Sequence, residues 1–143
     1  MLTLLLIRAC DEPSVAASRI AKTLAASGLT ITELWHARSD LSAALAHALF
    51  ALTGASARHV PDLDGGPQST LLTALATPRP GPVALCADEP LLSELVAWLA
   101  LGVPHMAHHS MLAPGAVVWL EGDPTPAGMA LRAHLTPAML AMP

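Results

Sequence analysis

Charged side chains and one thiol occur in two short sets, and each set follows a short apolar run. The first set lies within residues 8–12 (Arg-Ala-Cys-Asp-Glu) and the second within residues 87–90 (Ala-Asp-Glu-Pro). An arginine can hold an anion, a thiolate can act as a nucleophile, and carboxylates can bind a hard cation such as Mg²⁺ or Ca²⁺. Which of these chemistries is available depends on the elements that position the two sets.

Short apolar runs alternate with longer amphipathic stretches along the chain. Four stretches predict strands or extended segments: residues 2–7, 29–36, 59–63 and 83–86. Four stretches predict helices: residues 13–26, 39 or 40 to about 53, 69 or 70 to 76, and 91–101. Near the end of the chain, residues 116–120 and 129–134 predict an antiparallel hairpin.

Strands that are separated by helices predict a mostly parallel sheet with helices on both faces, which is an α/β three-layer sandwich. The whole chain, residues 1–143, is expected to form one domain, because this length suits a single hydrophobic core. In such a sheet, ligands bind beyond the carboxyl ends of the strands. Residues 8–12 and 87–90 are both expected at that edge.

The composition argues against several classes of protein. Of 143 residues, 53% are apolar and 13% are charged, which is incompatible with intrinsic disorder. The net charge of −4 argues against nucleic-acid binding, and no run of about 20 apolar residues predicts a membrane span. We therefore expect a cytoplasmic protein without a cofactor, whose partner is an unknown small molecule or protein. The low charge also leaves apolar surface uncovered, which would suit a homodimer.

Residues 5–8 (Leu-Leu-Ile-Arg) resemble the opening of the histidine phosphatase superfamily. In that family the first strand runs into Arg-His-Gly, and a later strand runs into Gly-His, any residue and Pro before a helix. Here the corresponding stretches are residues 8–10 (Arg-Ala-Cys) and 87–90 (Ala-Asp-Glu-Pro). Further matches resemble the SixA-like branch of phosphohistidine phosphatases: residues 34–36, 61–63 and 135–137. The resemblance covers nearly the whole chain and implies a phosphoglycerate mutase-like fold.

The same resemblance implies that both catalytic histidines are replaced, so no catalytic residue is predicted. The family's phosphate-accepting histidine falls at Ala9, and its second histidine falls at Asp88. A further family arginine falls near Leu41, one turn from Arg38, and Arg8 alone matches a family residue directly. Ala9 has no lone pair with which to attack phosphorus.

The charges near the two strand ends are also unfavourable for phosphate. One cation, Arg8, stands against the carboxylates of Asp11, Glu12, Asp88 and Glu89. Two unit charges about 4 Å apart interact by about 4 kcal/mol at an effective dielectric constant of about 20. We therefore expect no bound phosphate, and we expect Arg8 to form an ion pair with Asp88, Asp11 or Glu12.

The sequence predicts a degenerate relative of the SixA-like phosphatases that has a binding or regulatory role and no catalytic activity. One alternative is residual phosphatase activity on a phosphohistidine or small phosphoester, with Arg8 and Arg38 holding the phosphate. The other alternative is a homo-oligomeric interaction module. The candidate ligand-binding residues are Arg8, Cys10, His36, Arg38, Asp88 and Glu89.

Cys10 does not fit the loop of a cysteine phosphatase. Such a loop has an arginine six residues after the cysteine, where this chain has Ala16. Cys10 and Cys86 are therefore interpreted as small buried side chains at strand ends, with reduced thiols.

No metal site is predicted. Glu12 and Glu89 each precede a proline, so they are interpreted as acids at helix N-termini, where the backbone N–H groups stabilise negative charge. The histidines at residues 105, 108 and 109 are interpreted as part of a loop. Of the other histidines, only His36 is placed near the predicted crevice.

Overall fold

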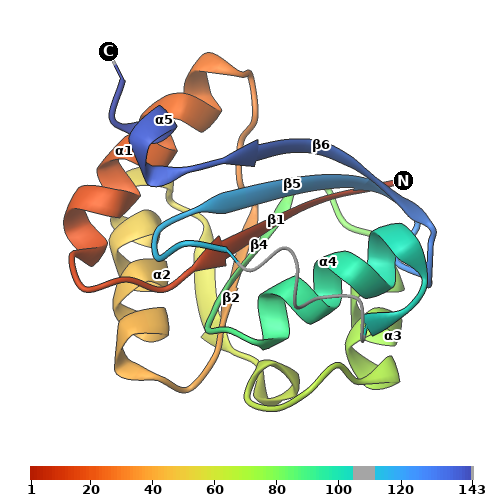
Figure 1. Cartoon of the computed structure of the whole chain (residues 1–143). Helices are drawn as coiled ribbons and strands as arrows, with labels where there is room; N and C mark the ends of the chain where they lie inside the picture. The colour runs from red at the N-terminus through yellow and green to blue at the C-terminus, as the bar shows by residue number, and fades with distance from the viewer. Residues whose placement is uncertain (105–111, 143) are drawn as a thin grey trace.

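The computed structural model describes residues 1–104 and 112–142, and these form a six-stranded sheet with helices on both faces (Figure 1). The strands in chain order are β1 (Leu2–Arg8), β2 (Glu33–His36), β3 (Ser56–His59), β4 (Val83–Ala87), β5 (Val117–Gly122) and β6 (Met129–Leu135). The helices are α1 (Pro13–Ala26), α2 (Asp40–Thr53), the 3₁₀ turn η1 (Pro61–Leu63), α3 (Ser69–Ala76), α4 (Leu91–Leu101) and α5 (Pro137–Leu140).

The sheet order is β3-β2-β4-β1-β5-β6. The first four strands in this order run parallel to one another, and β5 and β6 continue the sheet in antiparallel fashion. This is the mostly parallel sheet with a C-terminal hairpin that the sequence predicts.

Two apolar cores lie on opposite faces of the sheet. Helices α1, α2 and α5 cover one face, and α3 and α4 cover the other (Figure 1). Neighbouring residues of β1 alternate between these cores: Leu5 and Ile7 pack on the α1–α2 side, and Leu4 and Leu6 pack on the α3–α4 side. All five residues of β4 are buried. A strand buried on both faces is apolar throughout rather than alternating, which explains the continuous apolar runs.

Capping residues set the bounds of α2. The Ser39 hydroxyl accepts a hydrogen bond from the Ser42 N–H at 3.2 Å, and Gly54 ends the helix with a φ of +75°. The predicted hydroxyl cap of α3 is wrong. Its N-cap residue is Gln68, which makes no side-chain cap bond, and Ser69 is already helical.

Two predicted strands are displaced or shortened. The stretch at residues 29–36 contributes only Glu33–His36, because the Leu29 N–H bonds back to the Leu24 carbonyl and completes the end of α1. The extended piece predicted at residues 59–63 is wrong, since β3 ends at His59 and the chain then forms the turn Pro61–Leu63. Proline cannot donate to a ladder, so the strand stops before Pro61.

The hairpin between β5 and β6 depends on Gly122. Its φ is +143°, and a Cβ built there would lie 2.3 Å from the Gly128 carbonyl oxygen. A backbone neighbour at that distance cannot be accommodated by a side-chain rotation, so the turn requires glycine.

We predict that Gly122→Ala lowers the free energy of unfolding by about 1–3 kcal/mol, because the alanine Cβ would force the two hairpin strands apart. Urea denaturation followed by circular dichroism measures this change. The matched control is Gly66→Ala, since a Cβ at Gly66 meets no atom within 4 Å. Equal effects of the two substitutions would contradict the prediction.

Candidate functional site

The carboxyl ends of β1, β2 and β4 meet at one edge of the sheet. Residue Arg8 pairs in register with Ala87, and His36 pairs with Cys86. The Ala9 N–H donates to the Ala87 carbonyl at 2.9 Å. This hydrogen bond holds Ala9 and Asp88, the positions where the resembled family has its catalytic histidines, on adjacent chain segments. The two charged sets singled out in the sequence are therefore brought to the same edge.

Arg8 does not form the predicted ion pair. Among the described residues, no carboxylate lies within ion-pair distance of its guanidinium. Instead, Nη1 of Arg8 donates to the carbonyl oxygen of Leu112, a residue that is 1% exposed. The guanidinium therefore holds a backbone carbonyl where the family resemblance implies a phosphate.

Glu89 holds the backbone N–H of the same residue, Leu112. Oε2 of Glu89 accepts from the Leu112 N–H at 2.7 Å, and Oε1 accepts from the Ser93 N–H at 2.8 Å. Glu89 is thus an acid at the N-terminus of α4, as predicted. Both of its oxygens accept from backbone N–H groups, and no ion pair between Glu89 and Arg8 forms among the described residues.

Glu12 differs from Glu89. It is the N-cap residue of α1, but its side chain makes no cap hydrogen bond and is exposed. Both acids therefore lie at helix N-termini, as predicted, but only the Glu89 carboxylate accepts from a backbone N–H of its helix.

Ala9 and Asp88 occupy the two catalytic positions implied by the resemblance. Ala9 is 6% exposed and contributes only a methyl group. Asp88 is exposed, and its Oδ2 accepts from the Ser42 hydroxyl at 3.5 Å. Ser42 is itself linked to Ser39 at 2.8 Å, so the carboxylate is connected to the start of α2.

Asp88 also lines a crevice of about 240 Å³ beyond β4. Four of its lining residues are acids, namely Asp64, Asp88, Glu89 and Glu94, and its described lining contains no lysine or arginine. A phosphate entering this crevice would lie among negative charges. Of the four acids that the sequence analysis grouped around Arg8, Asp88 and Glu89 line this crevice, whereas Asp11 and Glu12 line a different cavity.

The side chains of three histidines come together at the end of β2, and the sequence predicts no role for two of them, His47 and His59. The ring centre of His36 lies 5.6 Å from that of His47 on α2 and 5.8 Å from that of His59 at the end of β3. Nδ1 of His36 lies 2.8 Å from the Ala37 carbonyl oxygen. A carbonyl can only accept, so Nδ1 carries the proton and, in the neutral ring, Nε2 carries the lone pair.

Asp64 joins this imidazole group to Arg38. Its Oδ2 lies 2.8 Å from Nε2 of His59, and its Oδ1 accepts from the Arg38 N–H at 2.7 Å. Burial opposes ionisation of the carboxyl, but the hydrogen bonds from Arg38 and His59 outweigh it and hold the pKa of Asp64 below its usual value. The Arg38 side chain is exposed, so its position leaves it available to an anion.

Cys86 is buried as predicted, whereas Cys10 is only half-buried. Burial raises the pKa of the Cys86 thiol to about 12. Burial, together with the carboxylates of Asp11 and Glu12, raises the pKa of Cys10. Both cysteines are free, and a thiol with a raised pKa is a poor nucleophile. Cys10 lines a separate cavity of about 320 Å³ between α1 and α5.

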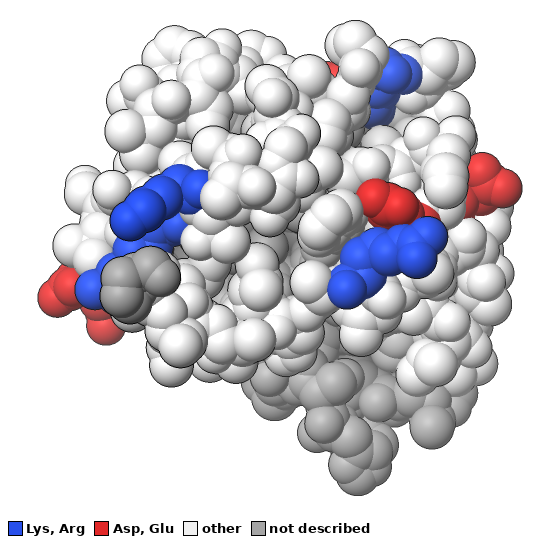
Figure 2. Space-filling model, turned by 90° about the horizontal axis from the view of Figure 1, so that it is seen from above, with Lys and Arg blue, Asp and Glu red and all other residues white. Residues whose placement is uncertain are grey.

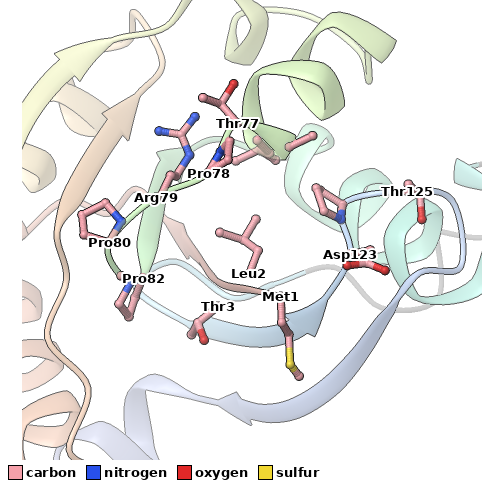
Figure 3. Close-up of a pocket in the computed structure, with 14 residues that line it drawn as sticks. Met1, Leu2, Thr3, Thr77, Pro78, Arg79, Pro80, Pro82, Asp123 and Thr125 are labelled. Carbon is pink, nitrogen blue, oxygen red and sulfur yellow. The ribbon is translucent and has the colours of Figure 1, made fainter.

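A larger cavity, of about 470 Å³, lies at the opposite edge of the sheet (Figure 3). It is bordered by Leu2 and Thr3 of β1, by the proline-rich loop before β4, and by the β5–β6 turn. Arg79 lines it, but its guanidinium donates to Glu33 at 2.6 Å and stacks 4.6 Å from the centre of the Trp35 ring. This cavity is therefore separate from the strand ends that carry Arg8 and Asp88.

Two further features are absent from residues 1–104 and 112–142, the part of the chain that the structure describes. No three His, Cys, Asp or Glu side chains converge there as ligands for a metal ion. No helix there is long and apolar enough to cross a membrane. The histidines at positions 105, 108 and 109 lie outside the described residues.

Comparison of the sequence with models of protein families and with curated proteins finds no match. Solved structures do match. A provisionally assigned phosphohistidine phosphatase SixA from Agrobacterium tumefaciens has a TM-score of 0.71 at 15% identity, over 95% of this chain and 98% of that one. A provisionally assigned SixA from Nakamurella multipartitia has a TM-score of 0.63 at 20% identity, over 95% and 96%. Phosphoserine phosphatase from Entamoeba histolytica has a TM-score of 0.76 at 9% identity, over 98% and 100%.

These structures establish the fold. The chain has the phosphoglycerate mutase-like fold that these solved phosphatase structures share, and proteins named SixA are among them. At these identities, the likeness says nothing of which residues act.

We predict that Asp64→Asn destabilises the protein by about 0.5–1 kcal/mol at neutral pH, because the bonds from Arg38 and His59 favour the ionised acid. The folded pKa is lowered, so the stabilisation is complete above the unfolded value of about 3.9 and is lost as pH falls through the folded value. The gap between wild type and variant should therefore close below about pH 4 in urea titrations. The control is Asp62→Asn, two residues away, and a gap independent of pH would refute the assignment.

Proposed function

We propose that this chain is a non-catalytic relative of the SixA-like histidine phosphatases that keeps the scaffold for a binding or regulatory role in the cytoplasm. The observation that carries the proposal is the state of Arg8. Its guanidinium donates to the Leu112 carbonyl, and the next residue, Ala9, offers no nucleophile.

The electrostatics of the edge support the same proposal. Phosphoryl transfer relies on cations that stabilise the oxygens of the transferring group. The crevice beyond β4 presents Asp64, Asp88, Glu89 and Glu94 instead. A ligand of this crevice is therefore expected to be neutral or cationic, or a protein segment with such groups, rather than a phosphate ester.

Residual phosphatase activity is the second candidate, and the imidazole group favours it. His36 lies at the same edge as Arg8 and Arg38, and its Nε2 carries a lone pair that could attack phosphorus. In this alternative, the attacking nitrogen would come from β2 rather than from the residue after β1.

We predict that the purified protein releases no p-nitrophenol from p-nitrophenyl phosphate above the rate of a protein-free blank, because Ala9 cannot form a phosphoenzyme. Isothermal titration with inorganic phosphate is likewise expected to give no binding heat. Hydrolysis that Arg8→Ala or Arg8→Lys abolishes, and that Arg19→Ala on the exposed face of α1 leaves unchanged, would overturn the non-catalytic proposal.

If hydrolysis is found, the variant His36→Ala tests whether His36 is the attacking residue. If the second candidate is correct, this variant loses activity and its folded stability in urea stays close to that of wild type. If activity survives both His36→Ala and Arg8→Ala, neither candidate explains it, and the signal comes from a contaminating phosphatase.

A further inference from the structure

Strand β6 forms one lateral edge of the sheet, and it pairs with β5 alone. In the described part of the chain, no other strand covers the backbone groups that β6 turns outward. Unpaired edges readily add a strand from another chain, so proteins usually guard them with lysines, prolines or a very short strand. β6 is seven residues long and contains no lysine and no proline.

Exposed apolar side chains lie on this edge and next to it, beside the exposed Arg132 and His134. Leu131 is 53% exposed on β6, and Met139 on the following helix α5 is 51% exposed. Figure 2 looks down on this side of the molecule and shows a broad area without charged residues between the charges on the left and those on the right. A surface of this kind is typical of a protein interface.

The one charge on β6 is turned back onto its own chain. Nε of Arg132 lies 3.2 Å from Oε2 of Glu121 on β5. The ladder between β5 and β6 is irregular at this point, with Leu131 opposite Leu120 and Ala133 opposite Trp119. Arg132 is thus the extra residue of a β-bulge. A bulge can guard an edge, but here it directs the guanidinium toward Glu121 and leaves Leu131 exposed beside it.

We propose that β6 is the interface of a homodimer, in which β6 of a second copy pairs antiparallel with it across a two-fold axis near Leu131. Antiparallel pairing of identical strands is self-complementary, as a two-fold interface must be. With the axis there, Leu131 faces Leu131 of the second copy, and Arg132 lies opposite Ala130 of the second copy.

Charge complementarity favours a second copy over another partner. Ala130 pairs with Glu121 in the observed register, so the small Ala130 side chain separates Glu121 from the incoming strand. Arg132 of each copy would therefore lie between Glu121 of its own chain and Glu121 of the other. Positive charges of the two arginines and negative charges of the two glutamates would then alternate around the axis.

The length of the strand sets the expected strength. Seven residues span about 24 Å at the antiparallel rise, and a strand pair with its flanking side chains lies at the small end of specific interfaces. The dimer should therefore dissociate on dilution rather than behave as an obligate assembly. The inference is independent of the proposed function, because Leu131 at the proposed axis is in register, through Leu120, with Leu4 in the middle of β1 and not with Arg8 at its end.

Sedimentation velocity of the full chain over a wide range of concentration tests the proposal. Wild type is expected to shift from monomer to dimer as concentration rises, and Leu131→Lys to weaken association at least about tenfold. The matched control is Leu52→Lys on α2, where the wild-type leucine is 55% exposed. Helix α2 packs on β2, β3 and β4, whereas β6 is the strand at the other end of the sheet order. A wild type that stays monomeric throughout, or a Leu131→Lys variant that dimerises like Leu52→Lys, would overturn it.

A charge swap provides the second arm, in case the lysine variant folds poorly. Arg132→Glu places four acids around the axis and should weaken the dimer, whereas Arg132→Glu with Glu121→Arg restores alternating signs and should recover it. Failure of the double variant to recover association, with native circular dichroism, would rule out this register.

Discussion

The backbone of Leu112 connects Arg8 and Glu89, two charged residues at the candidate site. Its carbonyl accepts from the Arg8 guanidinium, and its N–H donates to Glu89, which also caps α4. Backbone bonds reinforce the contact, since Gly115 donates to the Arg8 carbonyl and Arg8 donates to Ala116. The segment entering β5 is therefore fixed against the ends of β1 and β4. A cation that a phosphatase would use on substrate is here part of the chain's own hydrogen bonding.

The scaffold does not depend on the residues that would perform catalysis. β1 and β4 are held by buried apolar side chains on both faces, and Ala9 and Asp88 simply follow them. Replacing a histidine at either position leaves both cores intact. Fold and activity can therefore separate, which is why the solved phosphatase structures establish the architecture of this chain and leave its chemistry to its own residues.

The sequence was sufficient for most strands and helices, although it missed the turn Pro61–Leu63 and α5, and it was insufficient for the contacts of the site. Continuous apolar runs predict β1 and β4 because strands buried on both faces need no alternation. The imidazole group was missed because His36, His47 and His59 come from three elements and are more than ten residues apart. The predicted partner of Arg8, a carboxylate, was wrong for another reason. The actual partner is a backbone carbonyl, which no residue type in the sequence marks, and the nearby Glu89 accepts from backbone N–H groups instead.

The strand order has a consequence for how the chain folds. β1 is first in the sequence, yet both of its neighbours in the sheet, β4 and β5, lie in the second half of the chain. Residues 2–7 therefore leave the ribosome long before any partner strand exists. Pairings of such high sequence separation form slowly, because a long loop must close before contacts offset its entropy. During synthesis this apolar strand is a natural binding site for chaperones and a point of vulnerability to aggregation.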